Sequence, residues 1–409
     1  MAAKSLDTKL AKIKADPSSR EFIIADAKDA DMAFGIAAPG KSPEHYSQEG
    51  KFRSLPEFRE CIRQIVRQGV VDIMLMSAHM NSILTIQERL FDNSHVTPAA
   101  RANDTTDIHV MRGSIYTSEP SQPFRSTTID QIQCGKVDCH PNERVLGANL
   151  GLYSVTFNND TELDRQTLQH YREFRIEAER KGFRHFLEVF DPNAPANSVP
   201  PDKLGGFVND MIVRCLGGVP DSGRPLFLKM VYHGPKWTEE LAHYDPQLVI
   251  GILGGSSGTT YDAFKMIAEA QKYGARVALY GRKINNAENQ LAFIEMLRRI
   301  VDGQISPEEG VRAYHGILQG LGIKPYRSLD EDMKLTAQVM SYASGGRVQV
   351  PAMPSPAGGA PKSAALAPVA SCKPATRPAP APVPDTAPNF AKMNGKERAA
   401  YHRARIARI

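Results

Sequence analysis

The chain has 409 residues, of which 42% are apolar and 23% are charged, and its formal net charge is +5. This apolar share is enough for a large core, so a disordered protein is excluded. The sequence has no run of about 18 apolar residues, and its first residues lack the apolar central stretch of a secretory signal. We therefore expect no membrane-spanning segment and no secretory signal, and we predict a cytoplasmic protein.

The positive charge lies in the last part of the chain. Residues 346–409 hold ten basic and two acidic side chains, a net charge of +8, which leaves −3 for residues 1–345. The body of the protein therefore offers no positive field for DNA or RNA, and we expect no nucleic-acid partner.

The cysteines are scattered and odd in number, which favours reduced thiols over a disulfide framework. They are Cys61, Cys134, Cys139, Cys215 and Cys372. The segment CGKVDCH at 134–140 is the one cluster that could suggest a metal site. It has no second half like that of a zinc module, so we interpret it as a loop and predict no metal.

Eight strand-like apolar runs alternate with amphipathic helical patterns. The runs begin at residues 21, 70, 107, 149, 183, 225, 247 and 276, and the helical patterns occupy 54–69, 160–182, 202–218, 236–244, 260–274 and 287–303. Most runs lack polar alternation, which is typical of a parallel sheet covered on both faces. Right-handed crossovers then favour an α/β fold, a (β/α)8 TIM barrel within residues 1–345. An open doubly wound sheet is the alternative, because a count of strands does not show closure.

The sequence changes character after the predicted barrel. Residues 346–388 are rich in Pro and Ala, which predicts a disordered, semi-stiff linker. Residues 389–409 favour a short basic amphipathic helix that serves as a docking or targeting tail. A solvated basic tail and an arm for nucleic acid or acidic membranes are the other interpretations.

Three charged residues lie toward the carboxyl ends of apolar runs, namely Asp26, Glu188 and Lys229. In a parallel barrel these ends meet at one face, where active sites lie. Each residue also has a structural interpretation: Asp26 could pair with Lys28, and Glu188 with Lys229. A buried ion pair adds little stability over an apolar pair, whereas burial favours the neutral lysine amine that attacks carbonyl groups. We therefore predict a catalytic Lys229.

Glycines follow the seventh and eighth runs in a pattern that suits an anion. The segment ILGGSSGTTYDAF places Gly254, Gly255 and Ser256 between a strand end and a helix that begins near Thr259. The next run ends in ALYGRKINN, which places Gly281 and Arg282 at the matching point. Loops after strands seven and eight of a barrel often bind phosphate, so we predict a phosphate site there.

These segments resemble those of the Schiff-base (class I) aldolases, the group of tagatose-bisphosphate, fructose-bisphosphate and deoxyribose-phosphate aldolases. The resemblance runs from about residue 22 to 323 and is clearest in FLEVF, LFLKMV, LGGSSGTTYDAF and LYGRKINNAENQ. It implies that Lys229 forms an imine, that Glu188 is an acid and base, and that Asp26 assists. It also implies that the backbone of Gly254, Gly255 and Gly281, with the Arg282 side chain, holds phosphate.

The resemblance has two departures. Tyr153 stands where many relatives carry a lysine, and we expect it to move a proton instead. Leu253 stands where fructose-bisphosphate enzymes tend to carry a serine, so the identity of the substrate does not transfer.

We therefore expect an aldehyde-lyase that cleaves or forms a carbon–carbon bond in a sugar phosphate without a cofactor, and that assembles from identical chains. A metal-dependent lyase using His79, His109, Cys139 or His140 is one alternative. A non-catalytic sugar-phosphate sensor is the other. The linker and tail also resemble the encapsulation tails of bacterial microcompartment enzymes, which implies a shell-protein partner and a place in the compartment lumen.

Overall fold

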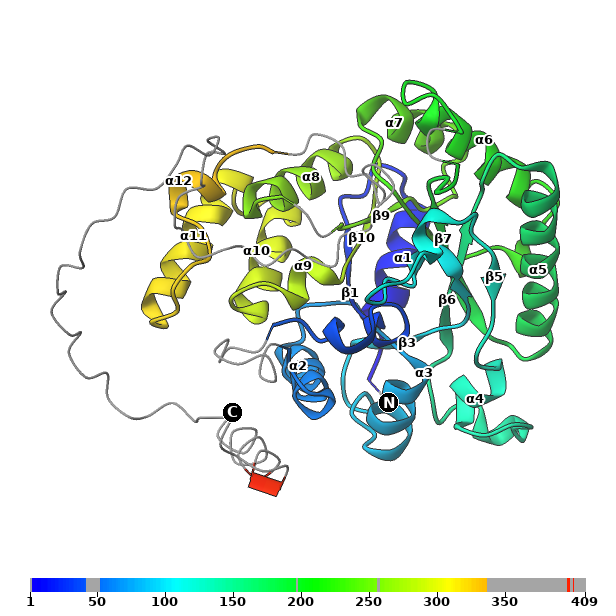
Figure 1. Cartoon of the computed structure of the whole chain (residues 1–409), viewed down its shortest axis with the longest axis horizontal. Helices are drawn as coiled ribbons and strands as arrows, with labels where there is room; N and C mark the ends of the chain where they lie inside the picture. Colours follow the sequence, from blue (N-terminus) through cyan, green and yellow to red (C-terminus); the bar gives the residue numbers. More distant parts are fainter. Residues whose placement is uncertain are drawn as a thin grey trace, which may run out of the picture.

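The structure, a computed structural model, describes residues 2–41, 52–195, 198–255 and 258–336, together with Lys396, Glu397 and Ala400. A closed barrel of eight parallel strands forms its centre, and helices surround it (Figure 1). The predicted (β/α)8 TIM barrel is confirmed, and the open sheet is excluded.

The barrel strands pair with their neighbours in chain order, and the last closes on the first, where Ile23 aligns with Val277. They are β1 Ile23–Lys28, β2 Ile73–Met76, β3 Thr97–Arg101, β6 Leu150–Thr156, β7 Arg184–Phe190, β8 Leu228–Met230, β9 Gly251–Leu253 and β10 Val277–Tyr280. Two further strands, β4 Asp104–Thr105 and β5 Pro123–Phe124, form a separate antiparallel pair.

The third strand is not where the sequence pattern predicts it. The run that begins at residue 107 enters a short 3₁₀ turn at Thr106–Ile108, and the strand is instead β3, with the sequence TPAAR. Its small side chains and its proline do not give the apolar, β-branched pattern that predicts a strand. Pro98 is tolerated because the pairing of β3 with β6 begins only at Ala100, so its missing N–H removes no bond of that ladder.

The six predicted helices all form, as α2, α5, α6, α7, α8 and α10. The helices are α1 Ser5–Ala15, α2 Leu55–Gln68, α3 Ala78–Asn81, α4 Ile129–Cys134, α5 Thr161–Arg180, α6 Leu204–Leu216, α7 Pro235–Tyr244, α8 Thr260–Lys272, α9 Arg282–Asn285, α10 Gln290–Val301, α11 Pro307–Gly320 and α12 Leu329–Asp332. Helix α2 shows the local logic: Ser54 and Glu57 form a capping box, and Gly69 ends the helix with φ of 69°.

Each barrel strand has two apolar faces that belong to different cores. One cluster contains the inward residues, such as Ala25, Leu152 and Phe186, together with Leu6 and Leu10 of α1, which thus packs against the barrel interior. A second cluster joins the outward strand residues to the surrounding helices. Because side chains alternate along a strand, a shift of one position moves a residue from the interior to the helix layer.

The predicted linker, residues 346–388, lies outside the described residues. Of the predicted tail, Lys396, Glu397 and Ala400 are described, and they are helical. None of the helices in the described part of the chain is both long enough and apolar enough to cross a lipid bilayer.

Candidate active site

Lys229 and Glu188 form the centre of the candidate site. They lie on the inner faces of the adjacent strands β8 and β7, where their Cα atoms are direct partners, and the Glu188 carboxylate contacts Lys229 Nζ. Lys229 is 7% exposed and Glu188 is 1% exposed. The ion pair weighed from the sequence is therefore present, and it faces a pocket.

That pocket lies where the carboxyl ends of the barrel strands meet. Its charged lining comprises Asp29, Arg101, Glu188, Lys229 and Arg282. The remaining described lining is mostly glycine, alanine and larger apolar side chains. Such a lining of converging charges in an apolar wall is typical of a small-molecule site.

Arg101 is a site residue that the sequence analysis missed. It ends β3, is 5% exposed, and donates from Nε to Asp29 Oδ2 at 2.6 Å. Its Nη2 lies 3.8 Å from Glu188 Oε2. Burial lowers the pKa of Arg101, but the carboxylates of Asp29, Glu188 and Asp104 raise it by more, so this guanidinium stays charged. The sequence pattern predicts the third strand from residue 107, so it does not show that Arg101 ends a barrel strand.

Ser154 holds the Glu188 carboxylate from the neighbouring strand β6. Its hydroxyl donates to Glu188 Oε2 at 2.6 Å and accepts a hydrogen bond from Arg101 Nη1 at 3.3 Å. A charged residue fixed by several polar neighbours keeps one orientation toward the pocket. Ser154 is therefore a positioning residue for Glu188.

Tyr153 does not reach the pocket, which corrects its predicted proton-transfer role. It belongs to the outer cluster, and its ring lies 5.1 Å from that of Tyr171 and 4.4 Å from that of Phe174, both on α5. Burial raises the pKa of its phenol. The alternation of side chains places Tyr153 outside the barrel and its neighbour Ser154 inside.

Asp26 also points away from the pocket, so its predicted catalytic role is corrected as well. It shares the outer face of β1 with Ile24 and pairs with Lys28, whose Nζ lies 2.9 Å from Asp26 Oδ2. Lys28 in turn donates to Asn285 of α9 at 2.5 Å. Burial raises the pKa of Asp26, and Lys28 acts against that shift. Three residues further on, Asp29 does line the pocket.

Two of the predicted phosphate-site glycines are required by close packing. A Cβ on Gly254 would lie 2.2 Å from the Tyr280 ring, and one on Gly281 would lie 2.9 Å from the carbonyl oxygen of Ala27. Both glycines line the pocket. Their bare backbone therefore serves the packing of β9, β10 and β1, and it also leaves main-chain atoms at the pocket wall.

Gly255 and Arg282 complete this end of the pocket. Gly255 has φ of +57°, a conformation that favours glycine, and it lines the pocket with Arg282. The Arg282 guanidinium lies 5.1 Å from the centre of the Phe34 ring. Ser256, the remaining predicted phosphate ligand, lies outside the described residues. This wall offers a cation and main-chain atoms to an anion.

The N-terminus of helix α8 is already occupied, which corrects its predicted part in anion binding. The Thr259 amide donates to Asp262 Oδ2 and the Thr260 amide donates to Asp332 Oδ1, both at 2.8 Å. Two carboxylates thus satisfy amides that an anion would need. Of the predicted phosphate-binding groups, Arg282 and the backbone of the glycines described above are the ones that line the pocket.

The three histidines of the metal-lyase alternative lie in different surroundings, and Cys139, which precedes His140, is bonded to Cys134. His79 lines a separate hollow, His109 packs edge-on against Phe124, and His140 precedes the 3₁₀ turn that begins at residue 141. Within residues 2–41, 52–195, 198–255 and 258–336, no group of three or more His, Cys, Asp or Glu side chains is placed to hold a metal ion.

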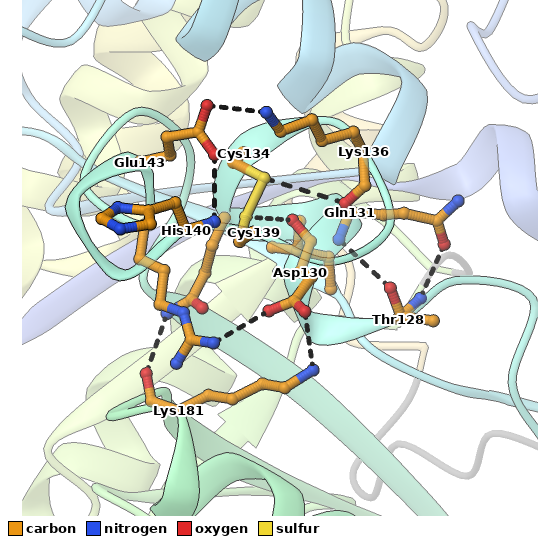
Figure 2. The surroundings of a disulfide bond; sticks show 12 residues. Thr128, Asp130, Gln131, Cys134, Lys136, Cys139, His140, Glu143 and Lys181 are labelled. Carbon is orange, nitrogen blue, oxygen red and sulfur yellow. Dashed lines mark hydrogen bonds and ion pairs between the residues drawn. A yellow bond between two sulfur atoms is a disulfide. The ribbon is translucent and has the colours of Figure 1, made fainter.

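Cys134 and Cys139 form a disulfide, so the expectation of reduced cysteines is wrong for this pair (Figure 2). Two residues between them, Gly135 with φ of 82° and Asp138 with φ of 61°, turn the loop back and bring the Cα atoms to 6.1 Å. Cys139 Sγ also lies 3.2 Å from the carbonyl oxygen of Asp130. The spacing of the cysteines alone does not reveal such a turn.

The comparisons with known proteins support the fold. The chain matches no protein-family model and no curated protein. Among solved structures, it is similar to an archaeal fructose 1,6-bisphosphate aldolase, with 17% identity and a TM-score of 0.50 over 73% of this chain and 100% of that one. It is also similar to the fructose-bisphosphate aldolase from Slackia heliotrinireducens DSM 20476, with 13% identity and a TM-score of 0.51 over 76% of this chain and 91% of that one. At such identities the similarity establishes the TIM-barrel fold.

Proposed function

We propose that the protein is a class I aldolase, an aldehyde-lyase that cleaves or forms a carbon–carbon bond in a sugar phosphate through an imine on Lys229. The observation that carries this proposal is the contact between Lys229 and Glu188 on the inner face of the barrel, at the wall of the pocket that also contains Arg282. An amine beside a proton acceptor in a largely apolar site is suited to covalent catalysis on carbonyl groups.

The first half of the reaction makes the imine. Glu188 accepts a proton from the Lys229 ammonium, and the freed lone pair attacks the carbonyl carbon of the substrate. A proton then passes from the attacking nitrogen to the former carbonyl oxygen, which gives a neutral carbinolamine. Glu188 then returns its proton to the hydroxyl group, which leaves as water, and the nitrogen forms an iminium with the carbon.

The second half breaks the carbon–carbon bond. A carboxylate removes the proton of the substrate hydroxyl group on the far side of that bond, whose electron pair moves onto the iminium. An aldehyde leaves, and an enamine remains on Lys229. Protonation of the enamine carbon and addition of water release the second product and restore the amine. Glu188 and Asp29 are the carboxylates that line the pocket, and they take the acid and base roles.

The phosphate of the substrate is assigned to the wall formed by Gly254, Gly255, Gly281 and Arg282. Binding of a non-reacting phosphate there fixes the carbonyl carbon next to Lys229, which lowers the entropic cost of reaction. The names of the two structural neighbours, both fructose-bisphosphate aldolases, agree with a sugar-phosphate substrate for this fold.

Trapping with borohydride tests the proposal. The protein is incubated with a panel of ketose and deoxy-sugar phosphates, reduced, digested and mapped by mass spectrometry. We expect a stable adduct on Lys229 that needs both substrate and reductant. A lyase that depends on a metal would give no adduct and would lose turnover with a chelator, and a sugar-phosphate sensor would bind without turnover. An adduct on another lysine contradicts the assignment.

The remaining proposals concern location and assembly. We propose that residues 389–409 dock to a microcompartment shell protein, and that residues 346–388 are the linker that joins them to the barrel. A cytoplasmic location or the compartment lumen, and an assembly of identical chains, belong to the same proposal. Fusing residues 389–409 to an unrelated reporter and testing co-purification with shell proteins decides the docking role, and light scattering decides the assembly.

A further inference from the structure

We infer that the substrate carries a single phosphate group, held at Arg282, and that its opposite end is uncharged and bears hydroxyl groups, held at Arg101 and Asp29. This inference rests on the proposed function, because it assigns a substrate class to the same pocket.

The two arginines lie on nearly opposite walls of the barrel. Arg282 follows β10, whereas Arg101 ends β3. Around the barrel, two strands lie between β10 and β3 on the path through β1, and four on the path through β8. Lys229 projects from β8 on the longer path. A substrate whose carbonyl group meets Lys229 therefore extends toward both walls.

The charge of Arg101 is already balanced by carboxylates. Its Nε lies 2.6 Å from Asp29 Oδ2 and 4.0 Å from Asp104 Oδ1, and its Nη2 lies 3.8 Å from Glu188 Oε2. One guanidinium thus faces three acidic side chains. A second phosphate at this end would approach a region of net negative charge, and the repulsion opposes its binding.

The described lining of the pocket has few cations to offer a second phosphate. Apart from its charged residues, the described lining of the pocket consists of glycine and apolar residues, among them Ala30, Ala33 and Ile108, which are buried. Among the described lining residues, the cations are Arg101, Lys229 and Arg282, and Lys229 is committed to the reaction. At the Arg101 end, a dianionic group would therefore meet only Arg101 among the described lining cations, and the carboxylates already balance that charge.

Hydroxyl groups suit this end better than phosphate. A guanidinium has five N–H donors, and Arg101 uses one toward Asp29 and one toward Ser154. Its remaining N–H groups can donate hydrogen bonds to a substrate oxygen. The Asp29 carboxylate can in turn accept a hydrogen bond from a substrate hydroxyl. A site that pairs both a donor and an acceptor with hydroxyl groups rejects ligands that leave those groups unpaired.

The first test compares substrates. We expect kcat/KM for fructose 1,6-bisphosphate to be at least about tenfold below that for the better of fructose 1-phosphate and fructose 6-phosphate, because of the repulsion described above. Asp29→Asn removes one carboxylate beside Arg101, so the difference in kcat/KM between the bisphosphate and the better monophosphate should become smaller. The surface control Asp92→Asn should leave that difference unchanged. A bisphosphate used as well as the better monophosphate by the wild-type protein overturns the inference.

The second test needs no turnover. Titration with inorganic phosphate in a calorimeter should show one site per chain, lost in Arg282→Gln and kept in Arg101→Gln. Two sites, no site, or loss of the site in Arg101→Gln overturns the inference. If no sugar phosphate gives an adduct on Lys229, the proposed aldolase activity fails, yet the phosphate titration still decides where and how many phosphates bind.

Discussion

Glu188 and Lys229 are Cα partners on neighbouring parallel strands, and their side chains meet inside the barrel. This register matters because both residues must point inward at the same level for the contact to form. A shift of either strand by one residue would turn one charge into the apolar helix layer. Replacing a buried ion pair by apolar residues often costs no stability, so we attribute the pair to chemistry.

Replacing Lys229 with Met should abolish both the borohydride adduct and carbon–carbon cleavage, because no other amine lines the described pocket. The fold should survive. In this variant the Glu188 carboxylate still accepts the hydrogen bond from Ser154 at 2.6 Å and lies 3.8 Å from the Arg101 guanidinium. Its buried charge therefore still has partners. We expect a loss in the free energy of unfolding below the roughly 3–5 kcal/mol typical of a broken buried pair.

The control for this variant is Lys265→Met on the outer helix α8, which should keep both the adduct and the activity. Peptide mapping and denaturant unfolding measure the two outcomes. Turnover that persists in Lys229→Met would rule out an imine at this position, whatever the effect on stability.

Glu188→Gln should lower kcat by about 10²- to 10⁴-fold, the range for loss of a general acid or base. The amide cannot take the proton from Lys229, so formation of the borohydride adduct should slow in parallel. Phosphate binding at Arg282 should not change. Stopped-time trapping and initial rates measure these effects, with the surface variant Glu295→Gln as the control. An equal rate of adduct formation in Glu188→Gln and wild type would assign the proton to another group.

The fold was predictable because most of its strands and helices have sequence patterns that extend over many residues. Apolar runs such as 183–190 and capped helices such as α2 each contain enough residues to reveal their type. The third strand was not predictable by the same logic, because TPAAR is short, small in side-chain volume and interrupted by Pro98. Its position depends on pairing with β2 and β6, which is a tertiary effect.

The candidate site was predictable in part. Glu188 and Lys229 stand out as isolated charges in long apolar strands, and they do meet at one pocket. Asp26 and Tyr153 lie in strands that are buried on both faces, where the sequence does not show which face is the interior. Only the closed barrel distinguishes an outward Tyr153 from an inward Ser154.

Tyr153 and Ser154 give a direct test of that distinction. Tyr153→Phe should leave kcat unchanged, because the ring packs against α5 and outside the pocket. Ser154→Ala removes the hydrogen bond to the Glu188 carboxylate, which is worth about 1.5–3 kcal/mol, and should lower kcat by roughly ten- to a hundredfold. Initial rates over a range of pH measure both. A large loss in Tyr153→Phe with none in Ser154→Ala would reverse the assignment.

His185 should make the barrel sensitive to acid. It is 4% exposed on β7, and its Nε2 lies 2.8 Å from the Tyr171 hydroxyl. Burial, with a smaller effect of Arg175, lowers the pKa of His185 to about 3 from 6.5. The folded protein therefore keeps this ring neutral, while the unfolded chain binds a proton below pH 6.5. The stabilisation is complete above that pH and is lost as the pH falls toward 3.

The variant His185→Gln removes this titration and keeps a polar partner for Tyr171. Between pH 6.5 and 4.5, we expect the wild-type protein to lose about 2 kcal/mol more free energy of unfolding than the variant. Denaturant unfolding at both pH values measures the difference, and all other titrating groups contribute equally to the two proteins. Equal losses in wild type and variant would mean that the ring is protonated in the fold, which its apolar setting between β7 and α5 opposes.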